Sequence, residues 1–196
     1  MDSRLKTELR EANEQCMTML IDMATRDGAP SFDLLRIIAP QLKALDREAL
    51  VRVSERPYLL VDFRFQDTPW WHSLESGNAS TSDTLTWNAH AHRAAFDLAQ
   101  RALTLAWHSV DTQRAAAILN LGISPGVADT LRHLPLQEIN RIADTHVHAM
   151  TPPWLNRPLM WCRLLDAAKD GRMESLRFVD RLGAQLLAAD LLTDPA

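Results

Sequence analysis

Two His-x-His pairs are the residues of this 196-residue sequence that could most directly bind a metal ion. They are His90-Ala91-His92 and His146-Val147-His148, and imidazole nitrogens are common zinc ligands. Residues two apart on a helix point about 200° away from each other, so His90 and His92 cannot chelate one ion from a single helix face. His146 and His148 stand at the predicted end of a helix and remain the candidates for a metal site. No CxxC motif supports them, so we favour structural or surface histidines and expect no cofactor.

The motifs that usually accompany catalysis are missing from the sequence. It contains no GxSxG, no P-loop, no GxGxxG after a strand and no HExxH. Acidic residues mostly stand beside basic ones in predicted helices, as on solvated faces. The sequence therefore predicts a protein that is not an enzyme.

The segment LNLGIS, residues 119–124, resembles the turn of a helix-turn-helix DNA-binding motif. Such a motif places its second helix in the major groove. The match is partial, because Val127 is five residues after Gly122 and Ala128 fills the sixth place, where the motif has its apolar residue. An ordinary packed helical corner is the alternative. The expected exposed residues of the second helix form a weakly basic set and are the candidates for DNA or partner contact: Asp129, Thr130, Arg132 and His133.

Tryptophan is the second unusual residue type, with six copies in a chain that has one tyrosine. Core packing is one explanation for them. A partner surface is the other, because Trp and Arg concentrate binding energy at protein interfaces. The predicted partner surface consists of Arg56, Arg64, Trp70 and Trp71.

The elements that must position these residues are predicted to be helices, so the expected fold is all-α and multihelical. Between residues 4 and 25 the apolar residues follow a 4-3-4-3-4 spacing, as on one face of a long helix. Capping residues, glycines and prolines mark the other boundaries. We expect helices at 31–38 (broken by Pro40), 46–57 (capped by Asp46), 84–110, before Gly122, from Ser124, from Pro135, at 159–169 and at 173–192, a short strand at 58–65 and a loop-like linker at 66–83.

Composition predicts a soluble, cytoplasmic protein. The hydrophobic fraction is 46%, and no apolar run approaches the roughly 18 residues of a membrane helix. Cys16 and Cys162 lack disulfide or metal spacing and suit reduced thiols. The net charge of −4 argues against a chain that holds nucleic acid by a broad basic face of its own.

One stretch of the sequence recurs later in the chain in a changed form. The blocks LKALDREALVRVSERP (residues 42–57) and LRHLPLQEINRIADTH (residues 131–146) align without gaps at an offset of 89 residues. Apolar residues that share a helix face recur together in this register. We interpret the match as an internal duplication with one repeat at 1–83 and the other at 84–196; chance similarity of two amphipathic helices is the alternative.

Both copies resemble FlhD, a subunit of the flagellar transcriptional activator of proteobacteria. The first copy carries the resemblance in LKALDREALVRVSERPYLLVDFRF (residues 42–65), and the second in ILNLGISPGVADTLRHLPLQEINRIADTH (residues 118–146). The resemblance implies an all-helical, intertwined homodimer. It also implies that this dimer activates promoters together with a zinc-bearing second subunit, FlhC, which supplies much of the affinity for DNA. The family's cysteine that links protomers would fall at about Val61, so that disulfide is not expected here.

Because the family is a single unit of about half this length, we expect one chain to mimic the dimer, with the long helices at 4–25 and 84–110 packed against each other. The predicted function is an FlhD-like transcriptional regulator or co-regulator that works with an FlhC-like partner and meets DNA only as part of a complex. Two alternatives stay open. One is a helical interaction protein or antagonist that does not bind DNA, and the other is a metal-binding protein. A further homodimer of the chain is also compatible with the sequence.

Overall fold

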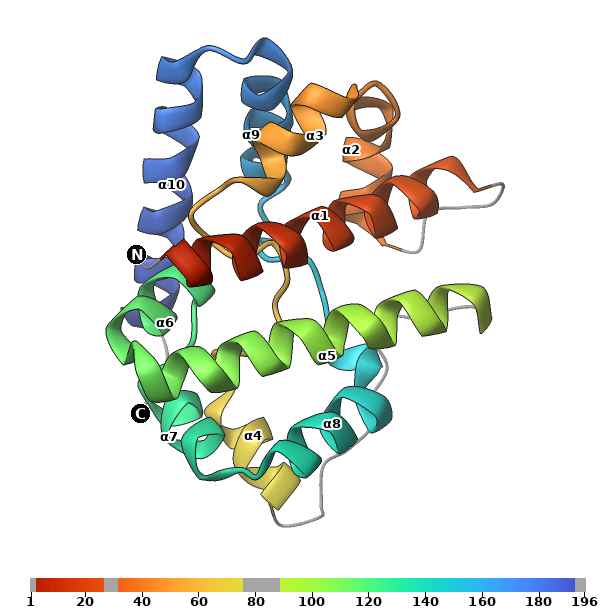
Figure 1. Ribbon diagram of the computed structural model, residues 1–196. Helices are drawn as coiled ribbons and strands as arrows, with labels where there is room; N and C mark the ends of the chain where they lie inside the picture. Colours follow the sequence, from red (N-terminus) through yellow and green to blue (C-terminus); the bar gives the residue numbers. More distant parts are fainter. Residues whose placement is uncertain (1–2, 27–31, 76–88, 193–196) are drawn as a thin grey trace.

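The chain folds into an all-α structure, seen in a computed structural model that describes residues 3–26, 32–75 and 89–192 (Figure 1). Within these ranges there are ten α-helices and no strand, and none of the helices is long and apolar enough to cross a membrane. In chain order the helices are α1 (Ser3–Thr25), α2 (Asp33–Lys43), α3 (Arg47–Ser54), α4 (Thr68–Glu75), α5 (Ala89–Thr112), α6 (Arg114–Leu121), α7 (Pro125–His133), α8 (Leu136–Thr145), the 3-10 turn η1 (Val147–Ala149), α9 (Pro158–Asp170) and α10 (Met173–Leu192).

Local capping signals fix most helix boundaries as the sequence predicts. The Asp46 side chain caps α3 by accepting a 2.7 Å hydrogen bond from the backbone N–H of Ala49. Gly122 ends α6 and Gly171 ends α9, and both adopt the left-handed conformation that costs glycine least (φ +69° and +71°). Ser124 caps α7. The predicted starts at Ser124 and Pro135 and the end at Gly171 are confirmed.

The prediction that Pro40 breaks the second helix is wrong. Helix α2 begins at Asp33 and continues through Pro40 to Lys43. A proline inside a helix removes one hydrogen bond to the carbonyl four residues earlier, here that of Arg36, but only one further turn follows it. Packing of Leu42, which is 1% exposed, holds that last turn. The predicted cap Ser31 lies outside the described residues.

The segment at 58–65 is irregular and forms no strand, so that prediction is also wrong. Leu59, Leu60 and Val61 are all at most 2% exposed, whereas a half-buried strand would alternate. The segment runs through the middle of the molecule, where both of its faces are covered. Its one ladder contact is an isolated antiparallel bridge between Asp62 and Thr151.

The expected linker at 66–83 contains a helix that its polar composition hides. Helix α4 occupies Thr68–Glu75, and Asp67 caps it by accepting a 2.9 Å hydrogen bond from the N–H of Trp70. Residues 76–83 lie outside the described residues. The predicted start of the second long helix at Thr84 lies outside them as well; the described helix runs from Ala89 to Thr112.

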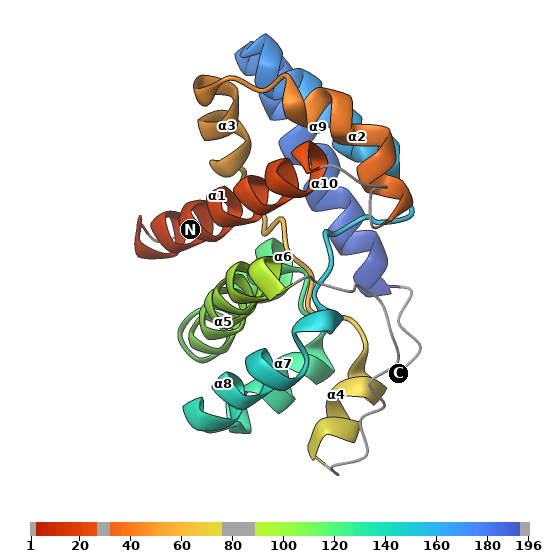
Figure 2. The same cartoon turned by 90° about the vertical axis from the view of Figure 1, so that its right-hand side faces the viewer.

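The two long helices α1 and α5 lie side by side and run antiparallel, with one group of helices on either side of them (Figures 1 and 2). Helices α2, α3 and α9 lie on the α1 side, and helices α4, α7 and α8 on the α5 side. Two helices therefore pack on the opposite half of the chain. Helix α4 from the first part packs on α7, whereas α9 from the second part packs on α2 and α3. Helix α10 packs on α9 and α6. The buried apolar residues of the described ranges form one continuous cluster.

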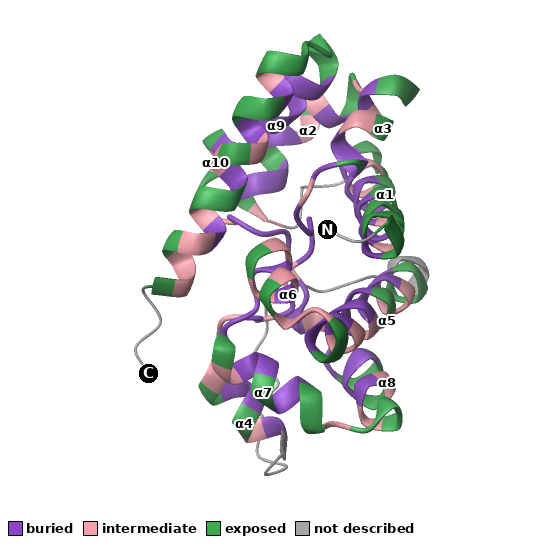
Figure 3. Cartoon of the chain, turned by 60° about the vertical axis from the view of Figure 1, so that its left-hand side comes forward, coloured by how far each residue is buried: buried purple, intermediate pink, exposed green. Residues whose placement is uncertain are grey.

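The buried faces of α1 and α5 follow the same pattern. Both helices turn this face to the interior and keep their opposite face exposed (Figure 3). Eight positions of α1 are buried at the same spacing as eight positions of α5 that lie 86 residues later. They are Leu9, Ala12, Asn13, Cys16, Met17, Met19, Leu20 and Ala24, which correspond to Ala95, Leu98, Ala99, Ala102, Leu103, Leu105, Ala106 and Val110.

Similar turns lead into α4 and α9, the two helices that pack on the opposite half of the chain. Arg64 before α4 and Trp154 before α9 both have positive φ angles, of 50° and 56°. Behind these turns Trp71 donates an indole hydrogen bond of 2.9 Å to the Arg64 carbonyl, and Trp161 donates one of 2.7 Å to the Pro153 carbonyl. Both indole rings are completely buried. The two turns and the two tryptophans are each 90 residues apart, close to the offset of 89 in the sequence match.

Candidate functional site

The corner between α6 and α7 is built from both parts of the chain. The Ser124 hydroxyl accepts a 3.2 Å hydrogen bond from the N–H of Val127 and lies 3.0 Å from the Thr68 hydroxyl of α4. The backbone N–H of Ser124 donates a 2.8 Å bond to the Phe65 carbonyl. At Gly126 an added Cβ would lie 2.7 Å from the Thr68 methyl carbon, so the absence of a side chain allows α4 to approach α7 this closely. The corner is therefore fixed to α4.

Three of the four residues predicted for DNA or partner contact lie on the exposed face of α7. Asp129, Arg132 and His133 are exposed, and the His133 ring nitrogen Nδ1 lies 2.7 Å from the Asp129 carbonyl oxygen. The expectation that Thr130 is exposed is wrong. Thr130 is 6% exposed because it follows Val127 by three residues and so shares the stripe that packs inward.

Acidic neighbours offset the positive charge of this face. The Arg114 guanidinium lies 2.8 Å from the Asp129 carboxylate, and its other nitrogen donates a 3.1 Å hydrogen bond to the Pro125 carbonyl. Arg132 lies 4.0 Å from Asp111 at the end of α5. Each arginine at the corner thus faces an aspartate. The corner lacks the basic surface by which a protein alone grips DNA phosphates.

The sequence reasoning missed Arg114 and Asp111, which set this charge balance. Both stand close to the ends of predicted helices, outside the candidate second helix. The signal that could have found them is the alternation of charges around the turn, with Asp111 and Arg114 before it and Asp129 and Arg132 after it. Opposite charges on adjacent helices of a tight corner are close enough to pair.

The four residues of the predicted partner surface hold helices together inside the chain. Arg56 is 7% exposed, and its guanidinium lies 2.9 Å from the Asp180 carboxylate of α10. Trp71 is fully buried and Trp70 is 8% exposed. The half-buried Arg64 places its guanidinium carbon 5.3 Å from the centre of the Trp70 ring. Their positions favour the core-packing explanation, and only Arg64 offers some of its surface to a partner.

The candidate metal ligands His146 and His148 lie next to each other with ring centres 5.7 Å apart. His146 is 7% exposed, and its Nδ1 atom is buried with no hydrogen-bond partner in the structure. Burial and the nearby His148 lower the pKa of His146. Among the described residues no group of three or more His, Cys, Asp or Glu side chains could hold a metal ion. The side chain of His90 lies outside the described residues.

Sequence reasoning also missed a buried asparagine that positions the irregular segment before α4. The Asn13 side chain of α1 donates hydrogen bonds of 3.2 Å to the Ser54 carbonyl and 2.9 Å to the Tyr58 carbonyl. Its oxygen accepts a 2.8 Å bond from the N–H of Leu60. One side chain thereby satisfies three backbone groups that no regular element pairs. The signal was a polar residue beside the apolar stripe of α1.

The structure thus defines the class of the protein as all-α, with a capped helical corner and a pair of long central helices. Comparison with known families then identifies part of the chain. Residues 97–192 match the family described as flagellar transcriptional activator (FlhD), and this half of the chain is FlhD-like. The match runs from within α5 to the end of α10 and contains both helices of the corner, α6 and α7. This is a family of transcriptional activators and not of enzymes, which is consistent with the prediction that the protein is not an enzyme.

The match does not reach residues 42–65, so the resemblance of the first copy stays a prediction. No curated protein and no solved structure matches the chain significantly.

Proposed function

We propose that the chain is an FlhD-like transcriptional regulator or co-regulator that reaches DNA through an FlhC-like partner subunit, in the cytoplasm. One observation carries the proposal: the FlhD-like half contains a helical corner whose two arginines, Arg114 and Arg132, both face aspartates. Affinity for DNA comes mainly from Lys and Arg at phosphates. A corner with balanced charge therefore suits a subunit that meets DNA beside a more basic partner.

The proposal includes a fused pseudo-dimer, in which residues 1–83 and 84–196 take the places of two protomers. The equal burial patterns of α1 and α5 support it, since the two long helices of a symmetric pair must bury equivalent faces. The exchange of α4 and α9 also supports it, because each of these helices packs on the other half as in an intertwined dimer. The alternative of chance similarity between amphipathic helices does not account for the matching turns before α4 and α9.

Within this proposal Asp129, Arg132 and His133 form the contact face of the corner, toward a partner or toward DNA held by that partner. Thr130 is left out because its side chain is buried. The face also holds paired charges that a partner can exploit: a partner carboxylate or guanidinium can replace one member of the Arg114–Asp129 pair.

An antagonist without DNA binding is the second candidate function. The lack of free positive charge at the corner favours it as much as it favours a co-regulator, since an antagonist needs only to occupy the partner. The two functions differ in one outcome. A co-regulator produces a complex of partner and DNA, whereas an antagonist removes one.

A gel-shift experiment with a flagellar promoter fragment distinguishes the functions. We expect no shift with this chain alone and a specific shift when an FlhC-like subunit is co-expressed with it. Arg132→Ala combined with His133→Ala should weaken that shift, and the matched control Arg181→Ala, on the exposed face of α10, should leave it unchanged. Loss of a shift that the FlhC-like subunit forms with its own FlhD would show an antagonist. A specific shift by the chain alone would contradict partner-mediated binding.

A further inference from the structure

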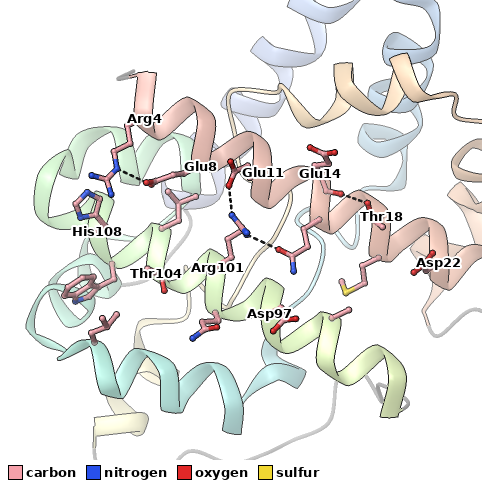
Figure 4. A pocket seen from close by; sticks show the side chains of 17 residues that line it. Arg4, Glu8, Glu11, Glu14, Thr18, Asp22, Asp97, Arg101, Thr104 and His108 are labelled. Atoms are coloured by element: carbon pink, nitrogen blue, oxygen red, sulfur yellow. Dashed lines mark hydrogen bonds and ion pairs between the residues drawn. The ribbon is translucent and has the colours of Figure 1, made fainter.

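A long groove separates the outer faces of α1 and α5, and the contact of Arg101 with Glu11 bridges it about halfway along (Figure 4). Its volume is about 1160 Å³, and Leu136 at the start of α8 adds to its lining. On α1 it extends from Arg4 to Asp22, which at 1.5 Å per residue is roughly 27 Å. This length matches about five turns of an α-helix.

The α1 wall of the groove is acidic. Its carboxylates belong to Glu8, Glu11, Glu14 and Asp22. Two of them are offset by arginines: Arg4 lies 2.8 Å from Glu8, and Arg101 of α5 lies 2.7 Å from Glu11. Glu14 and Asp22 form no ion pair with any of the described residues. The wall thus keeps two carboxylates whose charge is not neutralised.

The floor and one end of the groove are apolar. Met19 and Leu105 lie at the base and are 8% and 4% exposed. The half-buried Trp107 and the exposed Leu136 also line the groove. An occupant that buries an apolar stripe here and holds cations at its α1 side would match both features.

The α5 wall differs in charge from the α1 wall at three matching positions. With the offset of 86 residues that relates the buried faces, Glu8 corresponds to Ala94, Glu14 to Gln100 and Asp22 to His108, and all six residues line the groove. Two identical protomers would have to present two identical walls. Glu11 corresponds to Asp97, so both walls carry a carboxylate at this position. In this single chain the α1 wall holds four carboxylates and the α5 wall holds one, so the groove has a direction.

We propose that this groove docks one cationic amphipathic helix of a partner protein, with its basic side toward α1 and its apolar side on Met19, Leu105 and Trp107. Helix-in-groove recognition uses apolar anchors at helical spacing, and the length and floor of the groove suit it. Charge complementarity at the α1 wall fixes the orientation of the helix. The inference rests on the proposed function only in that the chain acts through protein contacts.

Fluorescence anisotropy with the full chain tests the proposal directly. The probe is a labelled 18-residue peptide of Leu and Lys at amphipathic helical spacing, and a peptide with Glu in place of Lys is the reference. We expect saturable binding of the Lys peptide, none of the Glu peptide, and weaker binding as salt rises, since exposed charge pairs are screened. The double variant Glu14→Gln, Asp22→Asn should weaken binding about tenfold, given the usual energies of exposed ion pairs.

The matched control is the double variant Glu55→Gln, Asp144→Asn, which changes net charge equally at exposed positions outside the groove lining. It should keep the native affinity. Equal loss in both variants would mean general charge attraction and would overturn the proposal, as would no binding of the Lys peptide. Self-association that the groove variant abolishes and the peptide displaces would assign the groove to a second copy instead. Because no DNA is present, failure here leaves the gel-shift test of the proposed function unaffected.

Discussion

Asp62 and Thr151 exchange two backbone hydrogen bonds, of 2.7 and 2.8 Å, and they are separated by the same 89 residues that relate the two similar blocks of the sequence. An antiparallel bridge of this kind pairs each residue with its own counterpart. A twofold axis between two equal protomers would produce the same pairing. This contact lies where the segment before α4 meets the segment before α9, between the two groups of helices.

Removing Asp180 should be costly, because it is the ion-pair partner of the buried Arg56. Asp180→Ala leaves the Arg56 guanidinium, only 7% exposed, without its carboxylate, and we expect the free energy of unfolding to fall by about 3 kcal/mol. Urea unfolding followed by circular dichroism measures the change. Arg93→Ala removes one member of an exposed pair and should cost less than about 1 kcal/mol. Equal costs for the two variants would contradict this account.

The carboxyl of Asp62 should make stability depend on pH. Burial raises its pKa, against the weaker opposing effects of the Phe65 N–H and of Arg64. An acid whose pKa is higher in the folded state destabilises that state when it is ionised, so its unfavourable contribution appears as pH rises through the raised pKa. We expect Asp62→Asn to raise the free energy of unfolding at pH 8, with a gain that shrinks as pH falls toward 4. Urea titrations at several pH values measure this, and a loss of stability at pH 8 would contradict it.

Trp71 and Trp161 should be equally important, because each is fully buried and donates to the carbonyl of the turn before its helix. Replacing either with alanine should cost about 3–5 kcal/mol, the usual range for a buried tryptophan. Thermal unfolding of the two variants provides the measurement. Tolerance of one substitution and not of the other would argue against equivalent roles for α4 and α9.

Gly183 should resist a substitution that normally stabilises helices. Glycine to alanine in a helix interior usually gains about 1 kcal/mol. At Gly183 of α10 an added Cβ would lie 2.3 Å from a carbon of the Tyr58 ring, and that ring is held by a 3.2 Å hydrogen bond to the Val179 carbonyl. We therefore expect Gly183→Ala to lower stability by about 1–3 kcal/mol. Gln185→Ala, on the exposed face, is the control and should change little.

Features set by local chemistry were predictable from the sequence. Asp46 and Ser124 cap helices because their side-chain oxygens reach an unpaired N–H within one turn, and Gly122 and Gly171 end helices because they accept positive φ. None of these interactions needs a distant partner. The all-α class and most helix boundaries followed from them.

Features set by distant partners were not predictable. The alternation at 58–65 indicated a strand, but both faces are buried because α1 and the second part of the chain cover them. The burial of Arg56 depends on Asp180, which lies 124 residues away. The helical corner itself was visible in the sequence, but its charge balance depends on Arg114 and Asp111 across the turn.

The most direct test of the fused pseudo-dimer is to cut the chain between its halves. A specific protease site inserted between residues 76 and 88 allows cleavage after folding, and size-exclusion chromatography with native mass spectrometry measures what remains associated. Because α4 packs on α7 and α9 packs on α2 and α3, we predict that the two fragments stay together with the mass of the intact chain and separate only in denaturant. Separation of the fragments into two folded species under native conditions would contradict the account.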